Sequence, residues 1–154
     1  MCLNNVKRVR QTKDIVCYKV LRIDKDSVMF SPYYSAKSWK LGRTESLRRD
    51  NSDITVDENG IYKIHGGAYH SYVNVNEIEK SYFLHSRYAV CKCIIPKNSK
   101  YVYKGISSNG TQGYASQKLK PIEILKLDEN DETVASTDII KRYSINNHLT
   151  IETY

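Results

Sequence analysis

Apolar residues recur along this chain mainly with the two-residue alternation of β-strands. The segment DIVCYKVLRI (14–23) has apolar residues on both alternating faces, which predicts a central strand covered on each side. The segment ITVDENGIYKIH (54–65) consists of two β-prone runs across a turn that contains Asp57, Asn59 and Gly60. Because Asn and Gly tolerate positive φ, this segment predicts a β-hairpin.

Helical periodicity is found in two places. Asn74 followed by Glu77 fits a capping box, and apolar residues at helical spacing after it predict a helix over 75–86. Ile139, Ile140 and Tyr143 are also spaced as on a helix. We therefore expect an α+β fold, a mostly antiparallel sheet of about five to seven strands with one or two helices packed on a face.

The length of 154 residues fits one domain with its own core. We expect a basic α+β domain over 1–127, followed over 128–154 by an acidic linker and a C-terminal helix and strand packed on the same domain. No apolar run approaches the roughly 20 residues of a membrane helix, and the basic N-terminus lacks a secretory h-region. The sequence thus predicts no membrane partner and a cytoplasmic location.

The cysteines raise the question of metal or redox chemistry. In the strand-like segment YAVCKCII (88–95), Cys91 and Cys93 share an alternating face with Ala89 and Ile95. Structural zinc sites usually take paired C-x₂₋₄-C knuckles, which this C-x-C pair does not provide. Buried thiols are the favoured interpretation, and we expect no metal and no cofactor. A metal site and a redox or catalytic thiol remain as alternatives.

The net charge of +7 is unevenly distributed. Residues 1–50 carry 12 Lys and Arg against 5 Asp and Glu, residues 51–126 carry 10 against 6, and residues 127–154 carry 2 against 6. A basic surface attracts polyanions, although plain solvation is the favoured explanation of such charge. The predicted partner is an anionic ligand, either a nucleotide or a nucleic acid, or else a host protein. A homo-oligomer is also open.

Arginine and tyrosine supply the candidate anion-binding residues. Arginine suits phosphate contacts, and tyrosine can stack on bases, although β-rich domains also place tyrosines on half-buried strand surfaces. The predicted anion- or nucleotide-binding residues are Arg8, Arg10, Arg43, Arg48, Arg49, Tyr69, Tyr101 and Tyr103.

Several short segments of the sequence resemble those of a known group of proteins. MCL, DIVCYKVL, SPYY, CIIPKNSKYVYKG and YASQKLKPIEIL, which span about residues 1–125, resemble a group of small uncharacterised proteins of gut bacteria and their phages. The resemblance implies provenance in a phage or mobile element. It also implies a host-directed role, such as countering a defence system.

A second resemblance is to the ADP-ribosyltransferase fold. CIIPKN followed by IEIL is similar to the order in that family of a strand ending IPKG and a strand with E-x-L, although Asn98 stands in place of the glycine. The resemblance implies an NAD-consuming enzyme with Glu123 as the catalytic glutamate and His65 or Arg22 on the nicotinamide side.

The sequence leaves three functions open. The first is a non-enzymatic binding protein of phage or mobile-element type that sequesters an anionic partner. The alternatives are the NAD-consuming transferase and a protein–protein inhibitor of a host factor that uses loops around Trp39 and the acidic tail.

Overall fold

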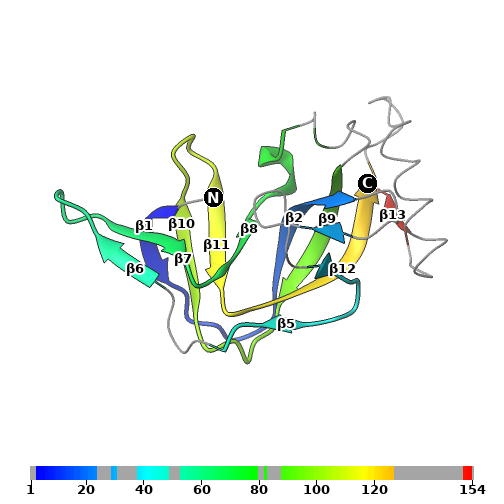
Figure 1. The fold of residues 1–154 in the computed structure, drawn as a ribbon, viewed down its shortest axis with the longest axis horizontal. Coiled ribbons are helices and arrows are strands. Elements are labelled where there is room, and N and C mark those ends of the chain that lie inside the picture. The colour runs from blue at the N-terminus through cyan, green and yellow to red at the C-terminus, as the bar shows by residue number, and fades with distance from the viewer. Residues whose placement is uncertain are drawn as a thin grey trace. The chain divides into compact units, whose positions relative to one another are not determined.

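Short strands make up nearly all of the regular structure of this chain (Figure 1). The structure is a computed structural model that describes residues 3–23, 29–30, 38–48, 53–79, 82, 88–126 and 151–153. The strands are β1 (Leu3–Arg8), β2 (Ile15–Ile23), β3 (Met29–Phe30), β4 (Ser38–Trp39), β5 (Glu45–Ser46), β6 (Asp53–Val56), β7 (Tyr62–Gly66), β8 (Tyr69–Tyr72), β9 (Tyr88–Ile95), β10 (Val102–Ile106), β11 (Gln112–Ser116), β12 (Lys118–Lys126) and β13 (Ile151–Thr153).

Interleaved segments of the chain form two compact units. Unit 1 consists of Met1–Tyr18, Thr44–Glu77 and Ile94–Lys120, and unit 2 consists of Lys19–Arg43, Ile78–Cys93 and Pro121–Tyr154. In unit 1 the strand order is β2-β8-β11-β10-β1-β7-β6, and β5 pairs with the start of β12. In unit 2 the order is β13-β12-β9-β2, with β3 between β2 and β4.

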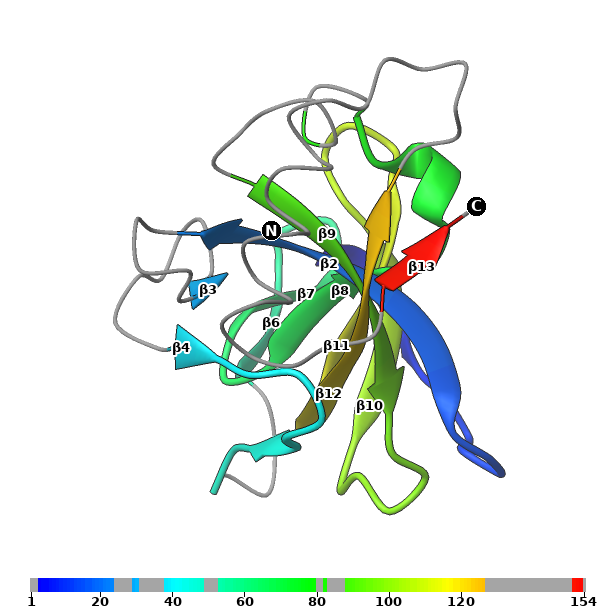
Figure 2. The ribbon, with the colours of Figure 1, turned by 90° about the vertical axis from the view of Figure 1, so that its right-hand side faces the viewer.

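Each unit has a core of strand residues. In unit 1, Leu3, Ile64 and Ala115 are fully buried and pack with Val6 and Tyr103. In unit 2, the row of Cys91 and Cys93 on β9 is also fully buried. Unit 2 further contains a parallel pair, in which Ile124 of β12 lies opposite Ile151 of β13 (Figure 2).

The predicted α+β class is wrong, because the fold is almost entirely sheet. Among the described residues, the only helical segment longer than one residue is the 3-10 turn η1 (Val75–Glu77). The predicted capping box does not form: Glu77 Oε2 accepts the backbone N–H of Gln112 at 3.0 Å, on β11, so it is unavailable to its own helix start. Residues 80, 81, 83–87 and 127–150, with the second predicted helix, lie outside the described residues.

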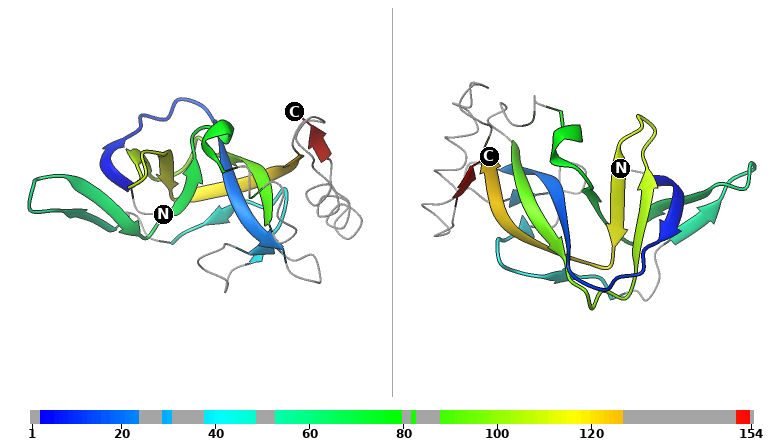
Figure 3. Two further views of the ribbon diagram at one scale, coloured as in Figure 1. Left: turned by 90° about the horizontal axis from the view of Figure 1, so that it is seen from above. Right: turned by 180° about the vertical axis from the view of Figure 1, so that it is seen from behind.

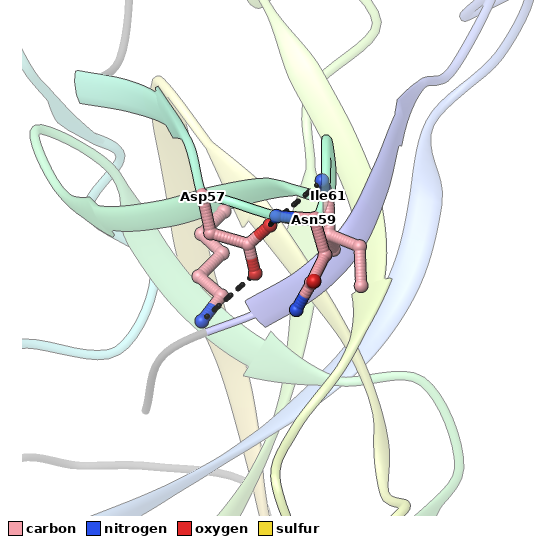
Figure 4. Close-up of polar contacts among 4 residues, drawn as sticks. Asp57, Asn59 and Ile61 are labelled. Carbon is pink, nitrogen blue, oxygen red and sulfur yellow. Dashed lines mark hydrogen bonds and ion pairs between the residues drawn. The ribbon is translucent and has the colours of Figure 1, made fainter.

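The mostly antiparallel pairing and the hairpin at 54–65 are confirmed. The strands β6 and β7 pair antiparallel, with Val56 opposite Tyr62, and Gly60 in the turn has a φ of 76°. Asp57 Oδ1 accepts the N–H groups of Asn59 and Ile61, both at 2.9 Å (Figure 4). The hairpin extends away from β10 and β11 (Figure 3).

Candidate anion-binding surface

A bulge in β1 opens one edge of that strand. Leu3 and Asn4 pair with β7, whereas Lys7 and Arg8 pair with β10, and the register shifts between Asn4 and Lys7. Asn5 lies in this shift with a φ of 52°, in the left-handed region that Asn tolerates better than most residues. After the bulge, the described pairs of β1 are with β10 alone, so among the described residues no strand pairs with its other edge.

Exposed cations cluster on the second half of β1, the loop that follows it, and β10 with the turn before it. The residues, which we call the basic strip, are Lys7, Arg8, Arg10, Lys13, Lys97, Lys100 and Lys104, all in unit 1. The segments 7–14 and 97–104 hold one acidic residue, Asp14. These two segments therefore carry a net charge of +6, compared with +7 for the whole chain.

Hydrogen bonds fix the two segments of the basic strip to each other. The Arg8 guanidinium donates to the Lys100 carbonyl at 2.9 Å, and the Val9 N–H donates to the Val102 carbonyl at 2.8 Å. Gln11 Nε2 donates to the carbonyls of Ile95 and Pro96 at 3.0 and 2.8 Å. Because these bonds span the two segments, the charges are held together by backbone geometry.

The Asp14 carboxylate is already engaged by the backbone. Its Oδ1 accepts the N–H of Lys97 at 2.8 Å, which fixes the turn that precedes β10. No described acid forms an ion pair with Lys7, Arg10 or Lys104. The field of these three cations is therefore not cancelled locally within the described structure.

Two lysines of the basic strip face each other. Lys7 on β1 lies directly opposite Lys104 on β10, so both side chains are on the same face of the sheet. Like charges directly opposite on neighbouring strands destabilise the pairing. An anion between these two side chains would relieve that repulsion.

The arginines predicted from the sequence are divided between the units. Arg8 and Arg10 lie exposed in the basic strip, and Arg48 is exposed after β5 in unit 1. Arg43 is exposed in unit 2, where its backbone N–H donates to the Lys40 carbonyl at 3.2 Å. Arg49 lies outside the described residues.

The three predicted tyrosines belong largely to the core. Tyr69 is buried and Tyr101 is 1% exposed, with the Tyr101 hydroxyl donating to the Gly67 carbonyl. Tyr103 is half-buried, and its ring centroid lies 5.9 Å from that of Tyr101. Tyr101 thus offers no ring face on which a base could stack. The sequence did not indicate Lys7 as a site residue. The bulge that sets Lys7 opposite Lys104 cannot be recognised from the alternation of apolar and polar residues along β1.

The predicted transferase residues fall in different units. Glu123 is half-buried on β12 in unit 2, and His65 is on β7 in unit 1. Arg22 is exposed on β2 in unit 2, opposite Phe30 of β3. The NAD-consuming activity stays a prediction.

The described cysteines are core residues, as predicted. Cys17, Cys91 and Cys93 are free and 0% exposed, and Cys93 Sγ donates weakly to the Cys91 carbonyl at 3.7 Å. Burial raises the pKa of Cys91 to about 12, an effect that Lys19 opposes only in part. The thiol is therefore protonated at neutral pH and a poor nucleophile. No group of three or more potential metal-ligating side chains occurs among the described residues.

Comparison with known proteins identifies no relative of this chain. No family model, curated protein or solved structure matches the chain. The resemblances to phage and gut bacterial proteins and to ADP-ribosyltransferases therefore stay predictions. Among the described residues, no helix is sufficiently long and apolar to cross a membrane.

Proposed function

We propose that this protein is a non-enzymatic binding protein whose basic strip binds a polyanion with a phosphate backbone, a nucleic acid. The observation that carries the proposal is the grouping of seven exposed cations on the strand pair β1–β10 and its adjoining loops. Phosphate contacts by Lys and Arg supply most of the sequence-independent affinity of nucleic-acid binders.

The geometry of the basic strip favours an extended ligand over a compact one. Lys7 and Lys104 lie on one face of the strand pair, and Arg8, opposite Tyr103, lies on the other face. The open edge of β1 after the bulge lies beside both faces. A flexible polyanion can therefore follow that edge and neutralise cations on both sides of the strand.

Binding to a fluorescently labelled single-stranded oligonucleotide, measured by anisotropy over a rising salt series, tests the proposal. Each phosphate neutralised on a single strand contributes about −0.7 to the slope of log K against log salt. Seven cations set a limit of about −5 for this slope. A clearly negative slope is the expected result. Absence of binding at low salt, or an affinity that does not change with salt, would overturn the proposal.

A further inference from the structure

One row of residues crosses four neighbouring strands of unit 1. Lys7 on β1 lies opposite Lys104 on β10, Lys104 lies opposite Tyr114 on β11, and Tyr114 lies opposite Ser71 on β8. Directly opposite residues on paired strands point to the same face of a sheet, and neighbouring strands are about 4.8 Å apart. The row therefore places two lysines and a tyrosine at neighbouring positions on one face of the sheet.

The row runs from solvent into the core. Lys7 and Lys104 are exposed, Tyr114 is half-buried, and Ser71 is 1% exposed. Ile106 is two residues from Lys104 on β10, on the same face, and is 43% exposed. Tyr114 and Ile106 are diagonal neighbours across β10 and β11, so an apolar surface adjoins the cations.

The Tyr114 hydroxyl is a neutral donor under ordinary conditions. Burial, and to a smaller extent the electrostatic influence of the nearby Cys17, raises the pKa of Tyr114 above its usual value of 10. The ring is thus uncharged at neutral pH, and no phenolate repels an approaching phosphate.

We propose that this row is a nucleotide-binding site in which Lys7 and Lys104 hold a backbone phosphate and the adjoining base stacks on Tyr114 and Ile106. The inference rests on the proposed function and restricts the ligand to single-stranded nucleic acid. In a duplex the bases are paired and stacked inside, and their faces are not available to a side chain. Tyr114 was not among the tyrosines predicted from the sequence, because its position beside Lys104 follows from the strand register.

Two labelled oligonucleotides of equal length and charge test the site, an oligothymidylate and an abasic oligomer. We expect the oligothymidylate to bind about tenfold more tightly, since stacking on an aromatic side chain is typically worth that factor or more per base. Tyr114→Ala should remove this difference by weakening oligothymidylate binding about tenfold and leaving abasic binding unchanged. Tyr114→Phe keeps the ring and should bind as the wild type does.

Two further measurements keep the result interpretable. Ile106→Ser changes an exposed side chain, so it should leave the fold intact and reduce the preference for the oligothymidylate. Circular dichroism of Tyr114→Ala tests whether the variant retains the sheet. Equal, salt-dependent binding of both oligonucleotides would overturn the stacking site and leave the proposed function standing. Absence of binding by either oligonucleotide would overturn both.

Discussion

Two strand edges of unit 1 have no pairing strand among the described residues, and their side chains differ sharply. The second half of β1 carries Lys7 and Arg8, whereas β6, the last strand in the order, carries Ile54 and Val56 on one face. Val56 is 57% exposed, and Tyr62 opposite it is 54% exposed. Charged residues on an edge discourage pairing with other strands, and exposed apolar residues invite it. The same kind of edge is therefore suited to anions in one place and to polypeptide in the other.

The strongest test of this comparison is charge reversal on the charged edge. Lys7→Glu with Lys104→Glu should weaken oligonucleotide binding by about a hundredfold or more at low salt, because two phosphate contacts become repulsions. Anisotropy titration measures the effect. Lys40→Glu with Arg43→Glu, both exposed in unit 2, makes the same change in net charge and should have a much smaller effect. Equal losses in both double variants would show that only net charge matters.

A steric change at β10 should damage the charged edge through its packing. A Cβ at Gly105 would lie 2.8 Å from both the Asn4 carbonyl oxygen and Val6 Cγ1, which is closer than real Cβ atoms approach. Gly105→Ala should therefore lower the free energy of unfolding by about 1–3 kcal/mol, as overpacking does. Urea unfolding measures the change. Gly110→Ala is the contrasting variant, with open space around the new Cβ but a φ of 85°, so its cost is backbone strain.

Exchanging the side chains of the two edges should exchange their behaviour. Val56→Lys places a cation on the apolar edge and should reduce concentration-dependent self-association in sedimentation velocity. Lys7→Val should increase it. Since both positions are exposed, each variant should change the unfolding free energy by less than about 0.5 kcal/mol. If the wild type and both variants sediment identically at every concentration, the open edges do not govern association.

The smallest effect should come from the turn of the β6–β7 hairpin. Hydrogen bonds from the Ile61 N–H, which contribute most, and from the Asn59 N–H, with the nearby Lys63, lower the pKa of Asp57 below its usual 3.8. The folded carboxylate binds fewer protons than the unfolded one, so its contribution to stability is present above pH 3.8 and is lost as the pH falls through the lowered value.

Asp57→Asn isolates that contribution. The variant should be slightly less stable than the wild type at neutral pH, and the difference should shrink as the solution is acidified. Thermal unfolding followed at several pH values measures it. A difference that is independent of pH would mean that the charge of Asp57 does not contribute.

The sequence predicted the structure correctly where local patterns determine it. It did not do so where a side chain binds a strand that is distant in the sequence. The hairpin at 54–65 and the buried row of Cys91 and Cys93 follow from turn chemistry and alternation, and both were predicted. At the start of the predicted helix 75–86 the chain forms a 3-10 turn, and the Glu77 carboxylate accepts the N–H of Gln112, a partner 35 residues away, instead of closing the capping box.

The candidate site could be predicted only in part, for a similar reason. Arg8 and Arg10 belong to a visible basic run, but Tyr114 reaches Lys104 and Lys7 only through the pairing of three strands. Tyr101 has the same composition cues as Tyr114 and is a core residue. No local property of the chain distinguishes these two tyrosines, since burial is decided by the register.

The extra residue in β1 changes which side chains of the strand lie on each face of the sheet. Three steps lead from Asn4 to Lys7, but only two lead from Ile106 to Lys104 on the partner strand. Continued without the irregularity, the ladder would have set Val6 against Lys104 and turned Lys7 to the opposite side. The extra residue at this irregularity, where Asn5 has a left-handed φ, thus sets which side chains of β1 and β10 lie opposite each other beyond it.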